Sequence, residues 1–412
     1  MLIDEYEMRS VDKSSLAELL LATKKNDPKK YIAYQYDREE IEKSVIYKHL
    51  KNEITILRYL DHPNIVKYQD VKKTKKHFYV IMEFCNGRRL SLALAKYMEK
   101  TGKPFPEEIV QHFMKQIIDA FKYIHERDIV HRCITMDNIM LNYENEEDAK
   151  NFNLMKAQIK IIDFLFSCRL KKDGLHDSLQ YLFLGNTMNT DPLIIKALKM
   201  PKKGNRGLGY NKSADIWSIG TVCYEMLIGH PVFNSEELGE FLSKIRKGTY
   251  SIPSTVSFEA ISFINGMLQY DAKQRLTASQ LSRHAFLNKD VNQFKKINLE
   301  KLSEIAKTGE FQMNARKDKD CTIWSIFNIK DETLLNSILG VECVKPIDKK
   351  EELELSKKKE IKSSVRVPTS GIPDNPKDEK ISGMSEEDFN LMKNNSINTG
   401  ATNPFIGSTI DL

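Results

Sequence analysis

The sequence predicts an α+β fold with two lobes, a small β-rich N-terminal lobe with one main helix and a larger, mainly α-helical C-terminal lobe. Two observations predict it. Short runs of β-branched and aromatic residues fill residues 1–85 around one segment of helical periodicity. From about residue 106, long segments with apolar residues at helical spacing follow one another instead.

The N-terminal lobe, residues 1–85, is expected to hold several strands and one helix. Apolar and β-branched residues cluster in four strand-length runs, at residues 19–24, 31–36, 64–71 and 77–84. Residues 43–60 place apolar side chains three and four positions apart, which indicates a helix between the second and third runs.

The C-terminal lobe, residues 86–290, is expected to be a set of packed helices. Residues 106–126 open with a proline and two glutamates, which suit a helix N-terminus. Residues 214–229 are apolar on most sides, so we expect a buried central helix there. Further helical segments are expected at residues 235–248, 257–269 and 277–284.

Two segments follow this lobe. Residues 291–344 are expected to form a short C-terminal extension. Residues 345–412 are rich in Lys, Glu, Ser, Asn, Pro and Gly and hold few large apolar side chains. Such a composition buries too little surface to offset the entropy of ordering, so we expect a disordered tail.

Composition narrows the class of protein. Hydrophobic residues make up 41% and charged residues 29%, a globular balance, and the formal charge of +6 is too small to indicate nucleic-acid binding. The six cysteines form no C-x-x-C pair, which favours a reducing compartment. No stretch reaches the length of a membrane span, and the first ten residues do not resemble a secretory signal. We therefore expect a cytoplasmic protein.

Several short motifs occur in a fixed order. They are HRCITMDN at residues 131–138, DFL at 163–165, DIWSIG at 215–220, Glu53 in a helix before HPNI, and Arg275 before HAFL. The series resembles the protein kinase superfamily, with its H-R-D-x-x-x-x-N loop, D-F-G and D-x-W-S-x-G, over roughly residues 5 to 287. Within it, the chain resembles serine/threonine kinases, loosely the Unc-51-like branch. The resemblance implies the two-lobed protein kinase fold.

The parts that such a kinase uses for phosphotransfer are altered. The resemblance places Asp12, Ser14 and Ala17 at the three glycines of the phosphate loop, Gln35 at the strand lysine, and Cys133 at the catalytic aspartate. A neutral amide cannot neutralise phosphate, and a thiol is a poor substitute for a carboxylate base. Losing base and lysine together predicts a rate lowered by about 10⁴-fold or more.

The resemblance also implies a nucleotide site and a metal site. The implied nucleotide contacts are Ala33 in the strand, Met82 at the gatekeeper position, Glu83 and Cys85 in the hinge, and Met140. Asn138 and Asp163 stand where kinases hold Mg²⁺. ATP and Mg²⁺ are therefore expected as cofactors that bind weakly or not at all.

The positions that hold the kinase fold together are retained. Four residues correspond to the stacked side chains that connect the lobes, namely Leu57, Tyr68, His131 and Phe164, and Asp215 is expected to anchor the catalytic-loop backbone. Glu53 stands at the kinase helix glutamate, and it is expected to lack its lysine partner because Gln35 replaces the lysine. The alternative is that Glu53 is an ordinary glutamate exposed on a helix. Asp191-Pro192-Leu193 replaces A-P-E, so Arg275 is expected to lose its glutamate partner.

Other features leave alternatives open. Arg132 pairs with a phosphate added to Ser178, Thr187 or Thr190, or else binds backbone carbonyls. The acidic residues 143–151 are expected to form a solvated hairpin. The segment with Trp324 and Phe327 resembles an autophagy-adaptor motif, and the alternative is that these aromatic side chains dock on the core. Residues 403–405 match the N-P-F turn bound by EH domains.

These observations favour a catalytically impaired serine/threonine kinase-like protein, a pseudokinase, that acts as a scaffold or allosteric partner. Its expected partners are proteins, either an active kinase or cytoskeletal or autophagy components. One alternative is a weak or unconventional ATP-dependent kinase that uses Lys13 and a metal on Asp163. Another is a switch that binds ATP without turnover.

Overall fold

The computed structural model describes most of both predicted lobes. The described residues are 1–13, 17–44, 46–170, 189–192, 211–233, 250, 252–253, 255–294, 317–318 and 321–322. All of them belong to one compact unit that includes Met1–Asn328. The predicted helix at residues 235–248, the predicted tail at 345–412, and the side chains of Trp324, Phe327 and residues 403–405 lie outside the described part.

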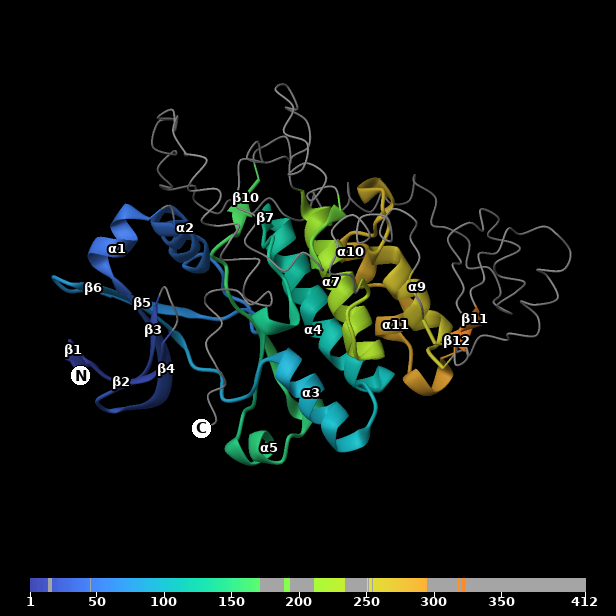
Figure 1. Ribbon diagram of the computed structural model, residues 1–412, viewed down its shortest axis with the longest axis horizontal. Coiled ribbons are helices and arrows are strands. Elements are labelled where there is room, and N and C mark those ends of the chain that lie inside the picture. Colours follow the sequence, from blue (N-terminus) through green and yellow to red (C-terminus); the bar gives the residue numbers. More distant parts are fainter. Residues whose placement is uncertain are drawn as a thin grey trace, which may run out of the picture. The chain divides into compact units, whose positions relative to one another are not determined.

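The N-terminal lobe is built on a six-stranded antiparallel sheet with the strand order β1-β2-β3-β4-β6-β5 (Figure 1). Its strands are β1 (Leu2–Ile3), β2 (Tyr6–Lys13), β3 (Glu18–Lys24), β4 (Asp27–Asp37), β5 (Tyr68–Lys73) and β6 (His77–Glu83). The four predicted runs correspond to β3, β4, β5 and β6. Strands β1 and β2 were not predicted, and both come before the first predicted run.

The two faces of this sheet carry separate hydrophobic clusters, as alternation of side chains along each strand requires. One face holds Tyr6, Met8, Leu20, Ala22, Tyr31, Ala33, Tyr79 and Ile81. On the opposite face Tyr36, Val80 and Met82 join the main core, and Ile32 and Tyr34 pack against it. Even-numbered residues of β4 therefore face the main core and odd-numbered ones face away from it.

The helix predicted at residues 43–60 is present, and a short helix that was not predicted comes before it. Helix α1 (Arg38–Lys43) begins at Asp37, whose side chain accepts from the backbone N of Glu40 at 3.0 Å. It ends at Ser44, which has an extended backbone. Helix α2 (Ile46–Leu57) follows and buries Leu50, Glu53, Ile56 and Leu57.

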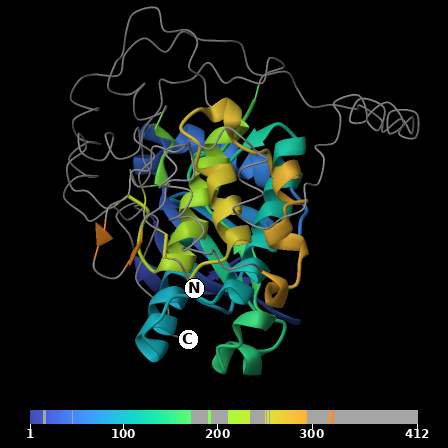
Figure 2. The same cartoon turned by 90° about the vertical axis from the view of Figure 1, so that its right-hand side faces the viewer.

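The C-terminal lobe is mainly helical. Its helices are α3 (Leu90–Thr101), α4 (Glu107–Glu126), α7 (Lys212–Ile228), α9 (Phe258–Met267), α10 (Ala278–Leu281) and α11 (Ala285–Asn288). Figures 1 and 2 show α4 and α7 side by side at the centre of the lobe, and the two are in contact. Helix α7 is buried on nearly every side, as its continuous apolar character predicts.

Short strands and turns between α4 and α7 carry the motif residues. They are β7 (Ile129–Val130), η1 (Met136–Asn138), β8 (Ile139–Asn142), α5 (Glu146–Lys150), η2 (Leu154–Lys156), β9 (Gln158–Ile161) and β10 (Cys168–Arg169). Strands β8 and β9 form an antiparallel hairpin, and β10 pairs with β7. The acidic insertion between β8 and β9 was expected to be a plain hairpin loop. It instead contains helix α5, at whose start the side chain of Asn145 accepts from the backbone N of Asp148 at 2.8 Å.

A few further elements complete the described part. They are η4 (Ala272–Gln274), η5 (Val291–Gln293), β11 (Lys317–Asp318) and β12 (Cys321–Thr322). None of the helices in the described ranges is both long enough and apolar enough to cross a membrane.

Candidate functional site

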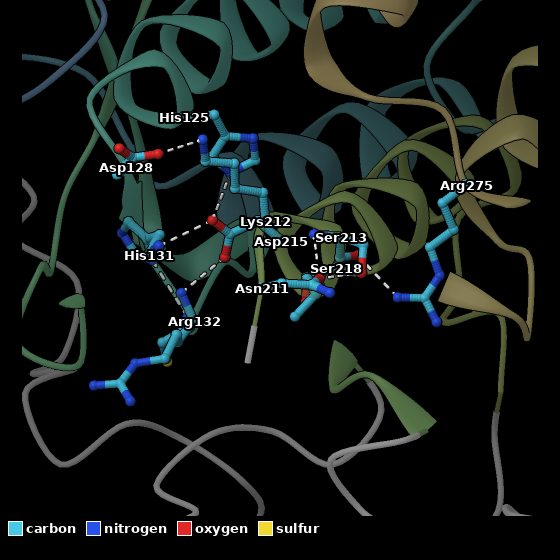
Figure 3. Close-up of polar contacts among 12 residues, drawn as sticks. His125, Asp128, His131, Arg132, Asn211, Lys212, Ser213, Asp215, Ser218 and Arg275 are labelled. Atoms are coloured by element: carbon cyan, nitrogen blue, oxygen red, sulfur yellow. Dashed lines mark hydrogen bonds and ion pairs between the residues drawn. The ribbon is translucent and has the colours of Figure 1, made fainter. Parts of the chain in front are cut away.

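The catalytic-loop backbone is held by one buried carboxylate. Asp215, in the first turn of α7, accepts from the backbone N of His131 at 2.9 Å and from that of Arg132 at 2.8 Å (Figure 3). Nε2 of His125 lies 2.9 Å from the same carboxylate. Arg132 has a φ of 69°, a conformation that costs energy for a residue other than glycine. The hydrogen bonds to Asp215 offset that cost and fix the loop.

The four residues expected to connect the lobes all lie in the main core or pack against it. The rings of His131 and Phe164 pack edge to face with centroids 4.7 Å apart, and both side chains are fully buried. Leu57 and Phe164 belong to the same cluster, and Tyr68 packs against it. Burial of these side chains stabilises the fold through the hydrophobic effect, whatever chemistry the cleft supports.

Cys133 stands at the base position in a dry environment. Its side chain is buried, and its carbonyl accepts from the side-chain amide of Asn138 at 2.7 Å. Burial, and then the nearby negative charge of Asp163, raise the pKa of the Cys133 thiol well above its ordinary value. The thiol therefore stays protonated at neutral pH, and it cannot accept a proton as a general base or act as a thiolate nucleophile.

The two predicted metal residues lie at the same end of one hairpin. Asn138 directly precedes β8 and Asp163 follows β9 by two residues. The backbone N of Ile162 donates to the carbonyl of Asn138 at 3.0 Å, which holds the two chain segments together. Asp163 has a φ of 63°, another left-handed position. The role of these residues as metal ligands stays a prediction.

Glu53 is buried and faces the segment that follows β9. Its Oε1 accepts from the backbone N of Phe164 at 2.9 Å, and only 5% of the residue is exposed. The alternative of an exposed helix glutamate is therefore wrong. Burial and the charge of Asp163 raise the pKa of Glu53 to about 8, although its hydrogen bond with Phe164 opposes the shift.

In strand β4, the side chains that face the main core are one residue away from those predicted to face the nucleotide. The side-chain amide of Gln35 donates to Glu18 at 3.0 Å, and Ala33 lies in the hydrophobic cluster on the far face of the sheet. Neither side chain faces Glu53, so the placement of Ala33 against an adenine ring and of Gln35 at the lysine position is wrong. Tyr34, between them, packs on the core side and interacts electrostatically with Glu53. A shift of one residue along a strand exchanges its faces.

Three further residues predicted to contact the nucleotide, Met82, Cys85 and Met140, differ in burial and in backbone pairing. Met82 is buried and pairs with Ile32 of β4 and with Tyr68 of β5. Cys85 is partly exposed. Met140 sits in β8 and forms an isolated bridge with Arg89.

Glu83, the other predicted hinge residue, forms an ion pair. Its carboxylate lies 2.8 Å from Nζ of Lys160, a lysine in β9 that is itself buried. Sequence reasoning missed this ion pair. The available signal was a lysine between two isoleucines in a short strand.

Arg275 retains a carboxylate partner, contrary to prediction. One of its terminal nitrogens forms an ion pair with Asp191, and both side chains are buried. The same nitrogen donates to the carbonyl of Ser213 at 2.8 Å (Figure 3). The carboxylate lies two residues before the position where the kinase glutamate stands, at Leu193. Alignment to the A-P-E motif compares residues position by position, so it could not show that Asp191 takes the place of the glutamate.

The start of the activation segment is well fixed. The side chain of Arg132 donates to the carbonyl of Phe166, as one of the two alternatives for this arginine expected. The side-chain amide of Asn52 in α2 donates to the carbonyl of Ser167 at 2.7 Å. Ser178 and Thr187 lie outside the described residues, so phosphorylation there stays a prediction.

Comparisons with known proteins agree with this geometry. A family model described as "Protein kinase domain" matches residues 13–287, more than half of the chain. Over 252 residues the chain is 31% identical to a protein named "Serine/threonine-protein kinase atg1" from Dictyostelium discoideum. That match covers 60% of this chain and 34% of the relative, so the chain spans about a third of the relative's length. The chain belongs to the protein kinase family.

Proposed function

We propose that this chain is a serine/threonine kinase-like protein with impaired phosphotransfer, which acts as a scaffold or allosteric partner of other proteins. The observation that carries the proposal is the buried thiol of Cys133 at the position where the family has its general base. Loss of a general base lowers a rate by about 10²–10⁴-fold.

The strand side of the cleft supports the same proposal. In a working kinase a strand lysine pairs with the α2 glutamate and neutralises phosphate charge. Here the β4 residues of that face that pack on the main core are Ile32, Tyr34 and Tyr36, none of which is positively charged, and Lys30 lies near Glu146 of α5. Loss of such electrostatic stabilisation costs about 10²–10³ in rate per donor.

The residues around the cleft differ in how well they suit the two cofactors of the family. Protein kinase domains bind ATP with Mg²⁺. Asn138 and Asp163 are adjacent, which suits a metal. The face of β4 that turns toward the main core carries Tyr34 and Tyr36 where the family places a lysine, so these residues do not supply the positive charge that binds the triphosphate. The proposed role therefore includes no phosphotransfer step.

The conserved architecture supports a binding role. Asp215, the His131–Phe164 contact and the Arg275–Asp191 pair hold the helical lobe and the ends of the activation segment in place. A fold that stays ordered without an intact phosphotransfer site suits a protein-binding role, and the modest net charge of the chain does not suit nucleic acid. The resemblance to the Unc-51-like branch favours an autophagy component over a cytoskeletal partner, and we place the protein in the cytoplasm.

A weak kinase is the second candidate, and the adjacency of Asn138 and Asp163 favours it. Lys13 would have to supply the missing charge. It lies at the end of β2, exposed and paired across the sheet with Glu18.

A phosphotransfer assay separates the two candidates. The full chain and its Asp163→Asn variant would be incubated with radiolabelled ATP, Mg²⁺ and a generic serine/threonine substrate. We expect equal, background-level signals from both. A signal from the natural chain that Asp163→Asn abolishes would establish the weak kinase instead.

A further inference from the structure

Two aromatic side chains stack on each other where helix α2 meets strand β6. The rings of Tyr47, in the first turn of α2, and Phe78, near the start of β6, have centroids 5.8 Å apart and an interplanar angle of 28°. Both residues are partly exposed, and both also pack against the main core. The pair therefore offers ring surface to solvent at a place that the core holds.

Three basic side chains surround this pair. Nζ of Lys51, one turn after Tyr47 on α2, lies 4.0 Å from the centroid of the Tyr47 ring. Lys73 is paired with Phe78 across β5 and β6, and its Nζ lies 5.2 Å from the Phe78 centroid. The guanidinium carbon of Arg38 lies 6.0 Å from the same centroid. We call these five residues the cationic aromatic patch.

The two lysines of the patch differ from their neighbours in having no acidic partner. Arg38 has one, since its Nε lies 3.0 Å from Glu42. Lys72, on the opposite face of β5 from Lys73, lies within 3.3 Å of three carboxylates. Among the residues that the structure describes, the ammonium groups of Lys51 and Lys73 form no ion pair, and both residues are exposed. They are therefore available to an acidic ligand.

The chemistry of the patch indicates the kind of ligand. Ammonium groups suit carboxylates, and partly exposed rings suit an aromatic side chain. A lipid surface fits less well. Both rings are only partly exposed and each has a cation over it, so the patch presents no protruding apolar side chain to enter a bilayer.

Helix α2 connects the patch to the start of the activation segment. The two residues after Lys51 both bond that segment. Asn52 donates to the carbonyl of Ser167 at 2.7 Å. Glu53 accepts from the backbone N of Phe164 at 2.9 Å. A ligand on the patch therefore contacts the helix that holds this segment in place.

We propose that the cationic aromatic patch binds an acidic segment of a partner protein that carries an aromatic side chain. Its carboxylates meet Lys51 and Lys73, and its ring packs against Tyr47 and Phe78. The inference rests on the protein-binding role proposed above and gives that role a surface. It does not depend on the state of the phosphotransfer site, which the assay with radiolabelled ATP judges by itself.

Fluorescence anisotropy with the full chain tests the patch. The probe is a short fluorescein-labelled peptide of glutamates around one phenylalanine. We expect saturable binding at low salt, and its loss at about 1 M salt, where the Debye length falls to about 3 Å. The double variant Lys51→Ala, Lys73→Ala should bind about three- to tenfold more weakly, because each exposed ionic contact contributes a few-fold. The matched control Lys100→Ala, Lys103→Ala removes two exposed lysines of the helical lobe and should bind as the natural chain does.

Two further variants separate the charges from the rings. Lys51→Glu, Lys73→Glu should lose the acidic peptide and gain a peptide in which lysine replaces each glutamate. Phe78→Leu keeps an apolar side chain and removes the ring. The natural chain should prefer the phenylalanine peptide over an alanine peptide by about two- to tenfold, and Phe78→Leu should lose that preference. If Phe78→Leu does not unfold cooperatively, Tyr47→Leu serves in its place.

Three outcomes would overturn the proposal. No binding of the acidic peptide to the natural chain at millimolar concentration would remove the site, while the phosphotransfer assay would still judge the proposed function. Equal weakening in the Lys51, Lys73 variant and in the Lys100, Lys103 variant would show that net charge alone attracts the peptide. Binding of phosphatidylserine vesicles that only the Lys51, Lys73 variant loses, without binding of the peptide, would assign the patch to a membrane surface.

Discussion

Two buried carboxylates in this molecule have very different surroundings. Asp215 receives two backbone N–H groups and a histidine nitrogen, and it holds the catalytic loop to α7. Glu53 receives one backbone N–H, that of Phe164, and faces Asp163 and tyrosines where the family places a lysine. Partners that the fold requires have been retained, while those that phosphotransfer requires have been replaced. A kinase fold can therefore stay ordered when residues expected for phosphotransfer are replaced, because different residues serve the two purposes.

The largest effect is expected at Asp215. Asp215→Ala leaves the backbone donors of His131 and Arg132 and the side chain of His125 without their acceptor in a buried site. Losing one side of such a buried charged network costs about 3–5 kcal/mol. Chemical denaturation followed by circular dichroism measures this directly. A loss below about 1 kcal/mol would mean that the anchor contributes little and would remove the basis of the comparison.

The Arg275–Asp191 pair gives the next effect. Asp191→Ala leaves a buried guanidinium without its carboxylate, so we expect a loss of about 3 kcal/mol in the free energy of unfolding. A double-mutant cycle with Arg275→Met isolates the pair, and the coupling is expected to lie near 1–3 kcal/mol. Additive effects would show that Asp191 does not replace the missing glutamate of the family.

At Glu53 a smaller gain is expected, and it depends on pH. The folded state raises the pKa of Glu53 from 4.5 to about 8, so it binds the proton more tightly than the unfolded chain does. The resulting stability is fully present below pH 4.5 and is lost as the pH rises to about 8. Glu53→Gln keeps an oxygen acceptor and cannot titrate. The variant should therefore be more stable than the natural chain at pH 8 by about 1 kcal/mol or more, with a flatter profile.

Urea midpoints measured between pH 5 and 8.5 would check that prediction. Parallel profiles for Glu53→Gln and the natural chain would mean that Glu53 is ionised and neutralised by a group other than a proton.

The smallest effect provides the baseline. Glu146 in α5 lies 3.9 Å from Lys30 of β4, and both side chains are largely exposed. An exposed pair contributes about 0–1 kcal/mol, so Glu146→Gln should change the free energy of unfolding by less than about 0.5 kcal/mol at every pH. A larger change would show that removing any glutamate charge affects this chain and would weaken the conclusion drawn from Glu53.

The sequence predicted most helices and strands of the described part, but only some of the contacts between side chains. The four predicted strands and the helices at residues 106–126, 214–229, 257–269 and 277–284 correspond to described elements. Periodicity did not show helix α1, because its six residues bury only Ile41 and so give no repeated apolar spacing. Short motifs with fixed spacing located His131, Phe164 and Asp215 directly.

Strand β4 shows where motif matching ends. Without a lysine to mark the position, nothing in Ile32-Ala33-Tyr34-Gln35 fixes which residue faces the core, since both faces of the strand are apolar. The cross-strand register with β3 and β6 decides it. Asp191 raises the same difficulty, because its partner Arg275 lies 84 positions further along the chain.

The sequence by itself determined the family, the order of the two lobes and the loss of the base at Cys133, because these follow from residue types at fixed local spacing. Tertiary structure alone decided which residues of β4 turn toward the main core, which carboxylate meets Arg275, and that the Cys133 side chain is buried. Each of these depends on side chains brought together from distant segments, where burial and neighbouring charge set the energies.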